Sequence, residues 1–409
     1  MLVTFLVFAS LALVLLVVVL WFLWPSSRIS TSVPGLNPSV ETLGNVQDIR
    51  DAGGLAKFLN SLHRDHGSIA SFWINDFLTI SLNSSSLFSL VSAGREKPYQ
   101  SLVPLTTDQS VLETVTRPDQ LLASLLSSFS PFSSRATADL QRPVERLVEE
   151  LFDALKQLRE EDHISIEDYV TALVVKIVSE TSPDIVSKPQ DPSKLRSLFA
   201  SLSAELDLFL DFGAPDLDAD QKSSLSRNIS EFCEKESEGG LEVFSQILVM
   251  TSLTSWALYY LAMDQELQTS LSQATEAKLE MFLTEVVRVS SLVPVRARVA
   301  RQDLSLLGHT VEQGTLVIDS LSSFFWSEKN FPNPREIDIN RPDCQRQPVL
   351  SLLHSNAANS YSFQVVLIVV RKFVQTFKLS PACCDMIVDQ KFRLVMRPDC
   401  DIWLKLDKK

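Results

Sequence analysis

The residues with the clearest capacity for chemistry are acids and arginines in the C-terminal half. Glu285 and Arg288 are three positions apart in KLEMFLTEVVRVSSL, so they share one face of the expected helix. A single Glu–Arg pair of this kind is common, and on a surface it adds little stability. Here it is followed by further motifs in a fixed order: Pro294 and Arg298, the stretch GHTVEQGT (308–315), Pro332-x-Pro334, and IDINR (337–341).

A second feature is the loop SLLHSNAANSY (351–361), which runs into an apolar stretch that must be buried. Small polar loops before a helix often hold a ligand at the helix N-terminus. The motifs GxSxG, GxGxxG, P-loop and HExxH do not occur in the sequence. The histidines show no metal-ligand spacing, and we expect His63 and His66 to face solvent on a surface helix. The histidines are His63, His66, His163, His309 and His354.

The ordered motifs resemble the C-terminal half of a cytochrome P450, in which an ExxR helix, a hairpin, a Pro-containing meander and a cysteine loop follow one another. The segment SVPGLNPSVETLGNVQDIRDAGGLAKFLNSLHRDHGSIASFW (32–73) resembles the start of family 20, subfamily A of these proteins. TSLTSWALYYLA resembles the central helix of the same branch. The resemblance covers roughly residues 1–83 and 241–409, and 84–240 is atypical or shortened.

The resemblance implies a set of site residues. Glu285, Arg288 and Arg341 would form a buried ion-pair network behind a haem, with a structural role. Arg298, with Arg296 as a further possibility, would reach a haem propionate, and the alternative is an edge-strand arginine that faces water.

The haem-ligand position falls near Asn356 when counted from the C-terminal side and near Tyr361 from the upstream side. The family places a cysteine thiolate there, but no cysteine lies between Cys344 and Cys383. A phenolate of Tyr361 could ligate iron, but Tyr361 and Asn356 are predicted only as cofactor-binding positions and no residue is assigned as a metal ligand. In the central helix, the positions that relay protons in the family fall on Leu248 and Val249, which cannot do so.

The elements that position these residues are mostly helices. Apolar spacing predicts helices over 142–158, 166–181, 194–212, 241–263 and 278–292, and from the loop to about residue 379. SIASFWINDFLTISLN predicts a hairpin, the region from 293 predicts strands, and KFRLVMRP with DIWLKL predicts a final hairpin. The fold class is therefore mainly α with a minor β part, which the resemblance makes P450-like. Residues 241–263 are expected to be a buried central helix, with a second membrane span as the alternative.

The first 24 residues contain no charge and are long enough to span a hydrocarbon core of about 30 Å. We expect a transmembrane anchor at 1–24, a Pro/Ser linker at 25–40 and a P450-like domain at 41–409. A cleaved signal peptide is the alternative. Arg28 on the downstream side favours a single-pass membrane protein with its domain facing the cytosol, and the endoplasmic reticulum is the expected membrane.

The net charge of −13 argues against a nucleic-acid partner. Five cysteines without regular spacing indicate free thiols rather than a disulfide framework. The resemblance implies a haem monooxygenase that takes electrons from a reductase and oxidises a lipophilic small molecule. The alternative is a haem-free P450 scaffold, either a pseudoenzyme or a binding protein, because the thiolate and relay residues are missing. An anchored helical domain unrelated to this family is the third reading.

Overall fold

The computed structural model describes residues 31–75, 77–92, 99–100, 132, 140–157, 163–182, 191–210, 240–300, 302–353, 357–383 and 386–409. The chain divides into Met1–Ser32 and a compact unit Val33–Lys409, and the account below concerns the second. This unit begins inside the stretch expected to be a linker. Leu36 N donates to Ser71 O at 2.9 Å, which ties that stretch to the sheet.

The expected anchor at 1–24 lies outside the described residues. Within the part of the chain that the structure describes, no helix is long and apolar enough to cross a membrane. This finding contradicts the expected single-pass localisation in the endoplasmic reticulum membrane. The apolar stretch 241–263, which had a second span as its alternative reading, is instead packed inside the domain.

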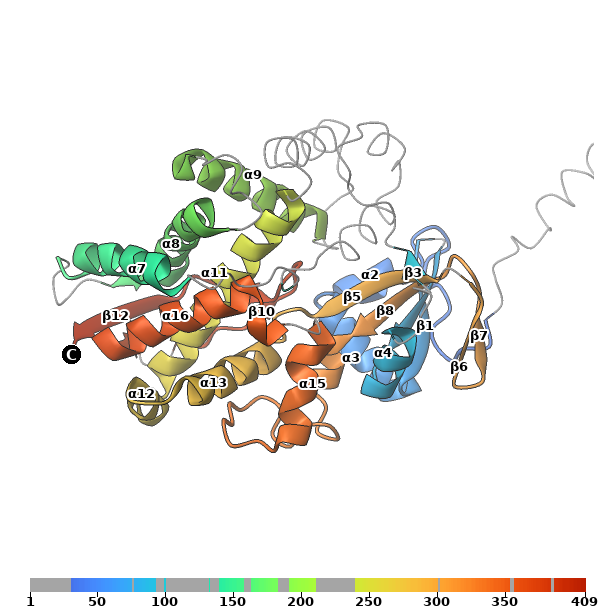
Figure 1. Ribbon diagram of the computed structural model, residues 1–409. Helices are drawn as coiled ribbons and strands as arrows, with labels where there is room; N and C mark the ends of the chain where they lie inside the picture. Colours follow the sequence, from blue (N-terminus) through green and yellow to red (C-terminus); the bar gives the residue numbers. More distant parts are fainter. Residues whose placement is uncertain are drawn as a thin grey trace, which may run out of the picture. The chain divides into compact units, whose positions relative to one another are not determined.

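Helices dominate the described chain, and strands form a minor part, as the sequence predicts (Figure 1). Apolar periodicity accounts for most of the helices, since each buries one face or, for α11, nearly its whole surface. The helices are α2 (Val46–Asp51), α3 (Leu55–His66), α4 (Ser85–Ser92), α7 (Gln141–Leu155), α8 (Ile166–Thr181), α9 (Pro192–Leu210), α11 (Gly240–Met263), α12 (Gln265–Ser272), α13 (Glu276–Val289), α14 (Leu321–Phe325), α15 (Asp343–Leu353) and α16 (Tyr361–Thr376), with a 3-10 turn η2 (Ala357–Asn359).

The largest sheet has the order β1-β2-β8-β5-β3, with β2 and β8 parallel and the other neighbours antiparallel. Its strands are β1 (Ile69–Ile74), β2 (Phe77–Leu82), β8 (Leu316–Ser320), β5 (Val295–Ala300) and β3 (Tyr99–Gln100). The expected hairpin of β1 and β2 is confirmed, and Asn75 at its turn has a φ of 52°. As the central strand, β8 is hydrogen-bonded on both edges, and its residues 317–320 are fully buried.

The smaller sheets correct the expected C-terminal hairpin. β12 (Trp403–Lys408) pairs with β9 (Phe377–Pro381) and β4 (Ile164–Ser165), whereas β10 (Gln390–Lys391) pairs with β11 (Arg397–Pro398). Helix α16 ends at Thr376, before the expected end at about residue 379, because Phe377 and the residues after it form β9. A separate hairpin joins β6 (Leu304–Leu306) to β7 (His309–Val311).

Helix α11 is the centre of the domain and contacts α8, α13, α16 and β9. Its residues from Val243 to Ala262 are buried with the exception of the half-buried Tyr260. The prediction of a buried central helix is confirmed. Several segments of the candidate site, described below, pack against this helix.

The expectation that His63 faces solvent is wrong. Its side chain lies under the sheet and the residue is 5 % exposed. The ring Nε2 is 2.8 Å from Ser81 Oγ on β2, and Nδ1 is 2.7 Å from Gly67 O. Helix α3 packs against the sheet with this face, because Leu55, Phe58 and Leu59 supply the apolar contacts beside it.

Candidate functional site

Glu285 lies at the centre of a buried ion-pair network on α13. Its Oε1 accepts from Arg288 Nε at 2.9 Å, and its Oε2 accepts from Arg288 Nη2 at 2.8 Å. Oε2 also accepts from Arg341 Nε at 2.9 Å and from the backbone N–H of Asp338 at 3.1 Å. Glu285 and Arg288 are fully buried and Arg341 is 4 % exposed. Bidentate, charge-assisted bonds of this kind satisfy a buried carboxylate that would otherwise be strongly destabilising.

The remaining donors of Arg288 hold the segment after α14. Arg288 Nη1 donates to Pro334 O at 2.6 Å and Nη2 donates to Glu336 O at 2.8 Å. The guanidinium carbon also lies 5.1 Å from the ring centroid of Phe331. The network therefore fixes an irregular segment of turns, residues 331–342, against α13.

A second buried carboxylate, Asp319 on β8, contacts both arginines of β5. Its Oδ2 accepts from Arg296 Nε at 2.9 Å and from Arg296 Nη2 at 2.7 Å, and it also accepts from Arg298 Nη2. Asp319 is fully buried. Arg296 Nη1 donates in addition to Leu352 O near the end of α15, at 2.7 Å. The side chain that was expected to reach a haem propionate, Arg298, is thus placed against a carboxylate of the chain itself.

The loop before α16 is shorter than the sequence suggests, because α15 extends to Leu353. Asn356 lies outside the described residues. Ser360 caps α16, since its Oγ accepts from Phe363 N at 3.3 Å. Tyr361 is fully buried, and its hydroxyl is 2.8 Å from Thr181 Oγ1 at the end of α8.

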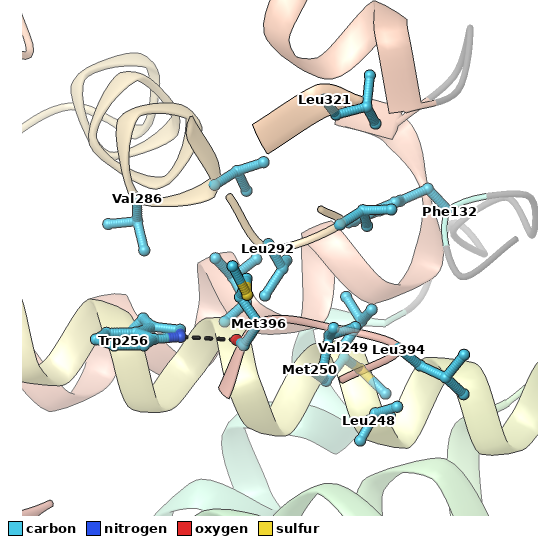
Figure 2. Packing of buried hydrophobic residues seen from close by; sticks show 14 of the residues in the cluster. Phe132, Leu248, Val249, Met250, Trp256, Val286, Leu292, Leu321, Leu394 and Met396 are labelled. Carbon is cyan, nitrogen blue, oxygen red and sulfur yellow. Dashed lines mark hydrogen bonds between the residues drawn. The ribbon is translucent and has the colours of Figure 1, made fainter. Parts of the chain in front are cut away.

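Apolar side chains gather around α11 in Figure 2, most of them above the helix and Leu248 at its lower edge. Helix α11 contributes three members of this central apolar cluster. The others come from the turn after α13, the start of α14, the residues 393–397, which we call the C-terminal segment, and Phe132. Each is at most 5 % exposed. We define the cluster as Phe132, Leu248, Val249, Met250, Leu292, Leu321, Leu394 and Met396.

Two hydrogen bonds to the backbone of Met396 hold the C-terminal segment in the cluster. Trp256 Nε1 donates to Met396 O at 2.9 Å, the dashed line in Figure 2. Met396 N donates to Leu292 O at 2.9 Å.

The hydroxyls of Thr251 and Thr254 do not replace a proton relay at position 249. They follow Val249 by two and five residues, and these steps rotate a side chain about the helix axis by about 200° and 140°.

Four charged side chains anchor the same segment on its outer side. Arg397 contacts Asp207 Oδ2 at 3.1 Å and Glu167, while Arg393 Nε is 3.2 Å from Asp207 Oδ1. Burial raises the pKa of Asp207, and the nearby charges of Arg397 and Arg393 act in the opposite direction. The C-terminal segment is therefore fixed to α8 and α9 by charges and to α11 by the cluster.

Comparisons with known proteins point to one family. A sequence model described as Cytochrome P450 matches residues 250–364, from the middle of α11 to the start of α16. A Mus musculus protein named Cytochrome P450 20A1 is 23 % identical over 474 residues, covering 99 % of each chain, and its Rattus norvegicus counterpart is 24 % identical over 478 residues. The resemblance to cytochrome P450 is confirmed. The Homo sapiens protein of the same name is 22 % identical over 464 residues, again covering 99 % of each chain. Because these alignments are longer than the 409 residues of this chain, they contain positions without a counterpart here.

The cytochrome P450 family implies haem, so the described residues must be tested for their fit to it. The family holds the iron by a cysteine thiolate, and no cysteine lies between Cys344 and Cys383. Both of these are exposed, Cys344 in α15 and Cys383 after β9. The hydroxyl of Tyr361 is engaged by Thr181, and Asp319 holds the arginine pair. These residues do not fit a haem bound as in a cytochrome P450.

The part of the chain that the structure describes also contains no group of three or more His, Cys, Asp or Glu residues arranged to hold a metal ion.

Asp319 is a site residue that the sequence analysis did not predict. A signal was present, because an acid ends an apolar strand (LVIDS) and two arginines alternate in the neighbouring stretch VPVRARV. Only the register of β5 against β8 shows that they meet.

Proposed function

We propose that this chain is a haem-free, cytochrome P450-like binding protein whose scaffold holds a lipophilic small molecule in the central apolar cluster. One observation carries the haem-free part. The loop before α16 has no thiol to present, and Tyr361 at the start of the helix bonds to Thr181 inside the protein. The engagement of Arg296 and Arg298 by Asp319 supports the same view.

The binding part is supported by the lining of the cluster. Its eight members are apolar side chains from five separate segments, which is the character of sites for lipophilic ligands. The positions expected to relay protons, Leu248 and Val249, belong to this lining and have no titratable group. The absence of a titratable group at these two positions supports binding without oxidation, and the proposal gives a reductase-type electron donor no role.

The test uses the full chain purified from cells supplied with a haem precursor. We expect no stoichiometric haem after desalting, and no long-wavelength Soret band after reduction and addition of carbon monoxide. A thiolate-ligated cytochrome prepared in the same cells controls for haem supply. Stoichiometric haem with the thiolate-type band would refute the proposal and favour the alternative, a haem monooxygenase.

A second measurement tests the binding part. Nile red, a neutral lipophilic dye, should show a saturable rise in emission with the chain, and neutral lipophiles should displace it. Val249→Asp places a charge in the cluster and should weaken dye binding at least tenfold, whereas the exposed Asp303→Asn should leave it unchanged. Linear, unsaturable dye uptake would show that no defined site exists.

A further inference from the structure

Among the described residues, the carboxylate of Asp319 receives hydrogen bonds on one of its two oxygens, Oδ2. We propose that its Oδ1 accepts a hydrogen bond from the hydroxyl of a neutral lipophilic ligand, and that the same carboxylate excludes ligands with a carboxylate of their own. The inference rests on the proposed function, since it names the chemical class of the ligand that the scaffold holds.

Strand register brings the three charged side chains together. Asp319 lies directly opposite Arg296 in the β5–β8 pairing, and Arg298 lies opposite Val317, one diagonal step away. Positions two apart on a strand share a face, so both guanidiniums reach the same carboxylate. Both reach its Oδ2, which leaves Oδ1 for another donor.

The second oxygen of Asp319 is the independent observation. Oδ1 is buried, and no hydrogen-bond donor contacts it among the described residues. An ionised carboxylate can accept at both oxygens, and a buried acceptor without a donor is destabilising. A donor from outside the chain, such as a ligand hydroxyl, would satisfy it.

The position of Asp319 suits a ligand in the central apolar cluster. Leu321, a member of the cluster, follows Asp319 by two residues at the start of α14. Leu292, another member, precedes Arg296 by four residues in the chain that enters β5. Members of the cluster therefore lie within four residues of both charged positions along the chain.

The charge of Asp319 decides which polar group is admitted. A ligand carboxylate would meet a buried carboxylate of the same sign, and it would have to compete for guanidiniums that Asp319 already binds. A hydroxyl brings a donor without a charge. The site therefore selects a lipophilic alcohol over the corresponding acid.

The experiment compares four probes that share one alkyl chain: dodecane, dodecanol, the methyl ether of dodecanol, and dodecanoate. Each displaces Nile red from the wild-type full chain. We expect dodecanol to bind about ten- to a hundredfold more tightly than its methyl ether, because only the alcohol donates to a charged acceptor. Dodecanoate should bind more weakly than the methyl ether.

Asp319→Asn supplies the variant arm, with Asp303→Asn at the exposed position just before β6 as the matched control. The arginines require an acceptor, so the asparagine must turn its oxygen to them and present its N–H₂ where Oδ1 lies. Dodecanol should then lose its advantage over the ether and dodecanoate should gain affinity, while Asp303→Asn keeps the wild-type order. The wild-type comparison decides the question even where the variant fails to fold.

The outcomes separate this inference from the proposed function. If the probes displace the dye but alcohol and ether bind within threefold of each other, Oδ1 takes water only and this inference is wrong. An unchanged order in a folded Asp319→Asn variant overturns it equally. If none of the probes displaces the dye, or if the chain retains thiolate-bound haem, the proposed function itself fails.

Discussion

Replacing Glu285 by glutamine removes the charge at the centre of the buried network while keeping its volume. Oε2 accepts three N–H bonds and Oε1 accepts one, so the glutamine oxygen should take the Oε2 position. Its N–H₂ group would then face the Nε–H of Arg288, a donor against a donor. Arg288 and Arg341 would remain buried without a counter-ion.

The expected loss of stability is about 3–5 kcal/mol, the usual range for breaking a buried ion pair from one side. Set against a total of about 5–15 kcal/mol for a folded domain, Glu285→Gln should leave a protein that unfolds at much lower denaturant concentration. The matched control is Glu276→Gln on the same helix. Its carboxylate contacts Arg371 at 2.6 Å, but the side chain is 56 % exposed. That pair should contribute about 0–1 kcal/mol, and its position in the first turn of α13 adds about 0.3–1 kcal/mol.

The assay is urea unfolding of the full chain followed by circular dichroism, with both variants and the wild type at one pH. We expect the midpoint to fall far more for Glu285→Gln than for Glu276→Gln at similar slopes. Equal losses of unfolding free energy in the two variants would mean that burial does not determine how much the ion-pair network stabilises the protein. The structural role proposed for Glu285 would then be wrong.

Three further changes test other contacts. Burial lowers the pKa of His63 to about 4 from 6.5, so the folded state prefers the neutral ring and stability should fall by up to roughly 3 kcal/mol as pH drops through that window. His63→Gln should flatten this loss in urea unfolding at pH 7 and pH 4.5, and a wild type without the loss would contradict the burial of the ring. Gly35→Ala should destabilise the sheet edge strongly in a thermal melt, since a Cβ would lie 2.0 Å from Ser71 O, and an unchanged melting temperature would disprove that contact. Trp256→Phe removes the bond to Met396 O and should reduce stability by about 1–2 kcal/mol, with faster proteolysis of the C-terminal segment as the readout; wild-type rates would show the bond to be dispensable.

Local patterns in the sequence predict most of the helices and the first hairpin. The apolar spacing of α7 and α8 and the uniform apolarity of α11 each have one physical outcome, burial of a stripe or of the whole helix. The β1–β2 hairpin is similarly local, because its turn residue Asn75 tolerates positive φ. Such elements depend on residues close together in the chain.

The errors concern contacts between distant segments. DIWLKL alternates like half of a hairpin, but β12 takes its partners from β9 and β4, and sequence alternation does not specify which edge a strand joins. The sequence predicts that His63 is a surface residue, because it does not show that Ser81 of β2 lies within hydrogen-bond distance of the ring. Polar residues with a distant buried partner are the class that periodicity misplaces.

The inferred ligand site depends on a difference between two buried carboxylates, Glu285 and Asp319, in the hydrogen bonds that their oxygens accept. Glu285 receives hydrogen bonds on both oxygens, from two guanidiniums and a backbone N–H, so no capacity remains for a ligand. Asp319 is equally buried and also binds two guanidiniums, but its bonds within the described part of the chain fall on Oδ2. A group whose only purpose is stability gains nothing from a buried, unpaired oxygen, because that oxygen loses its hydration without replacement. From this unequal use of the two oxygens we propose a structural role for Glu285 and a ligand-binding role for Asp319.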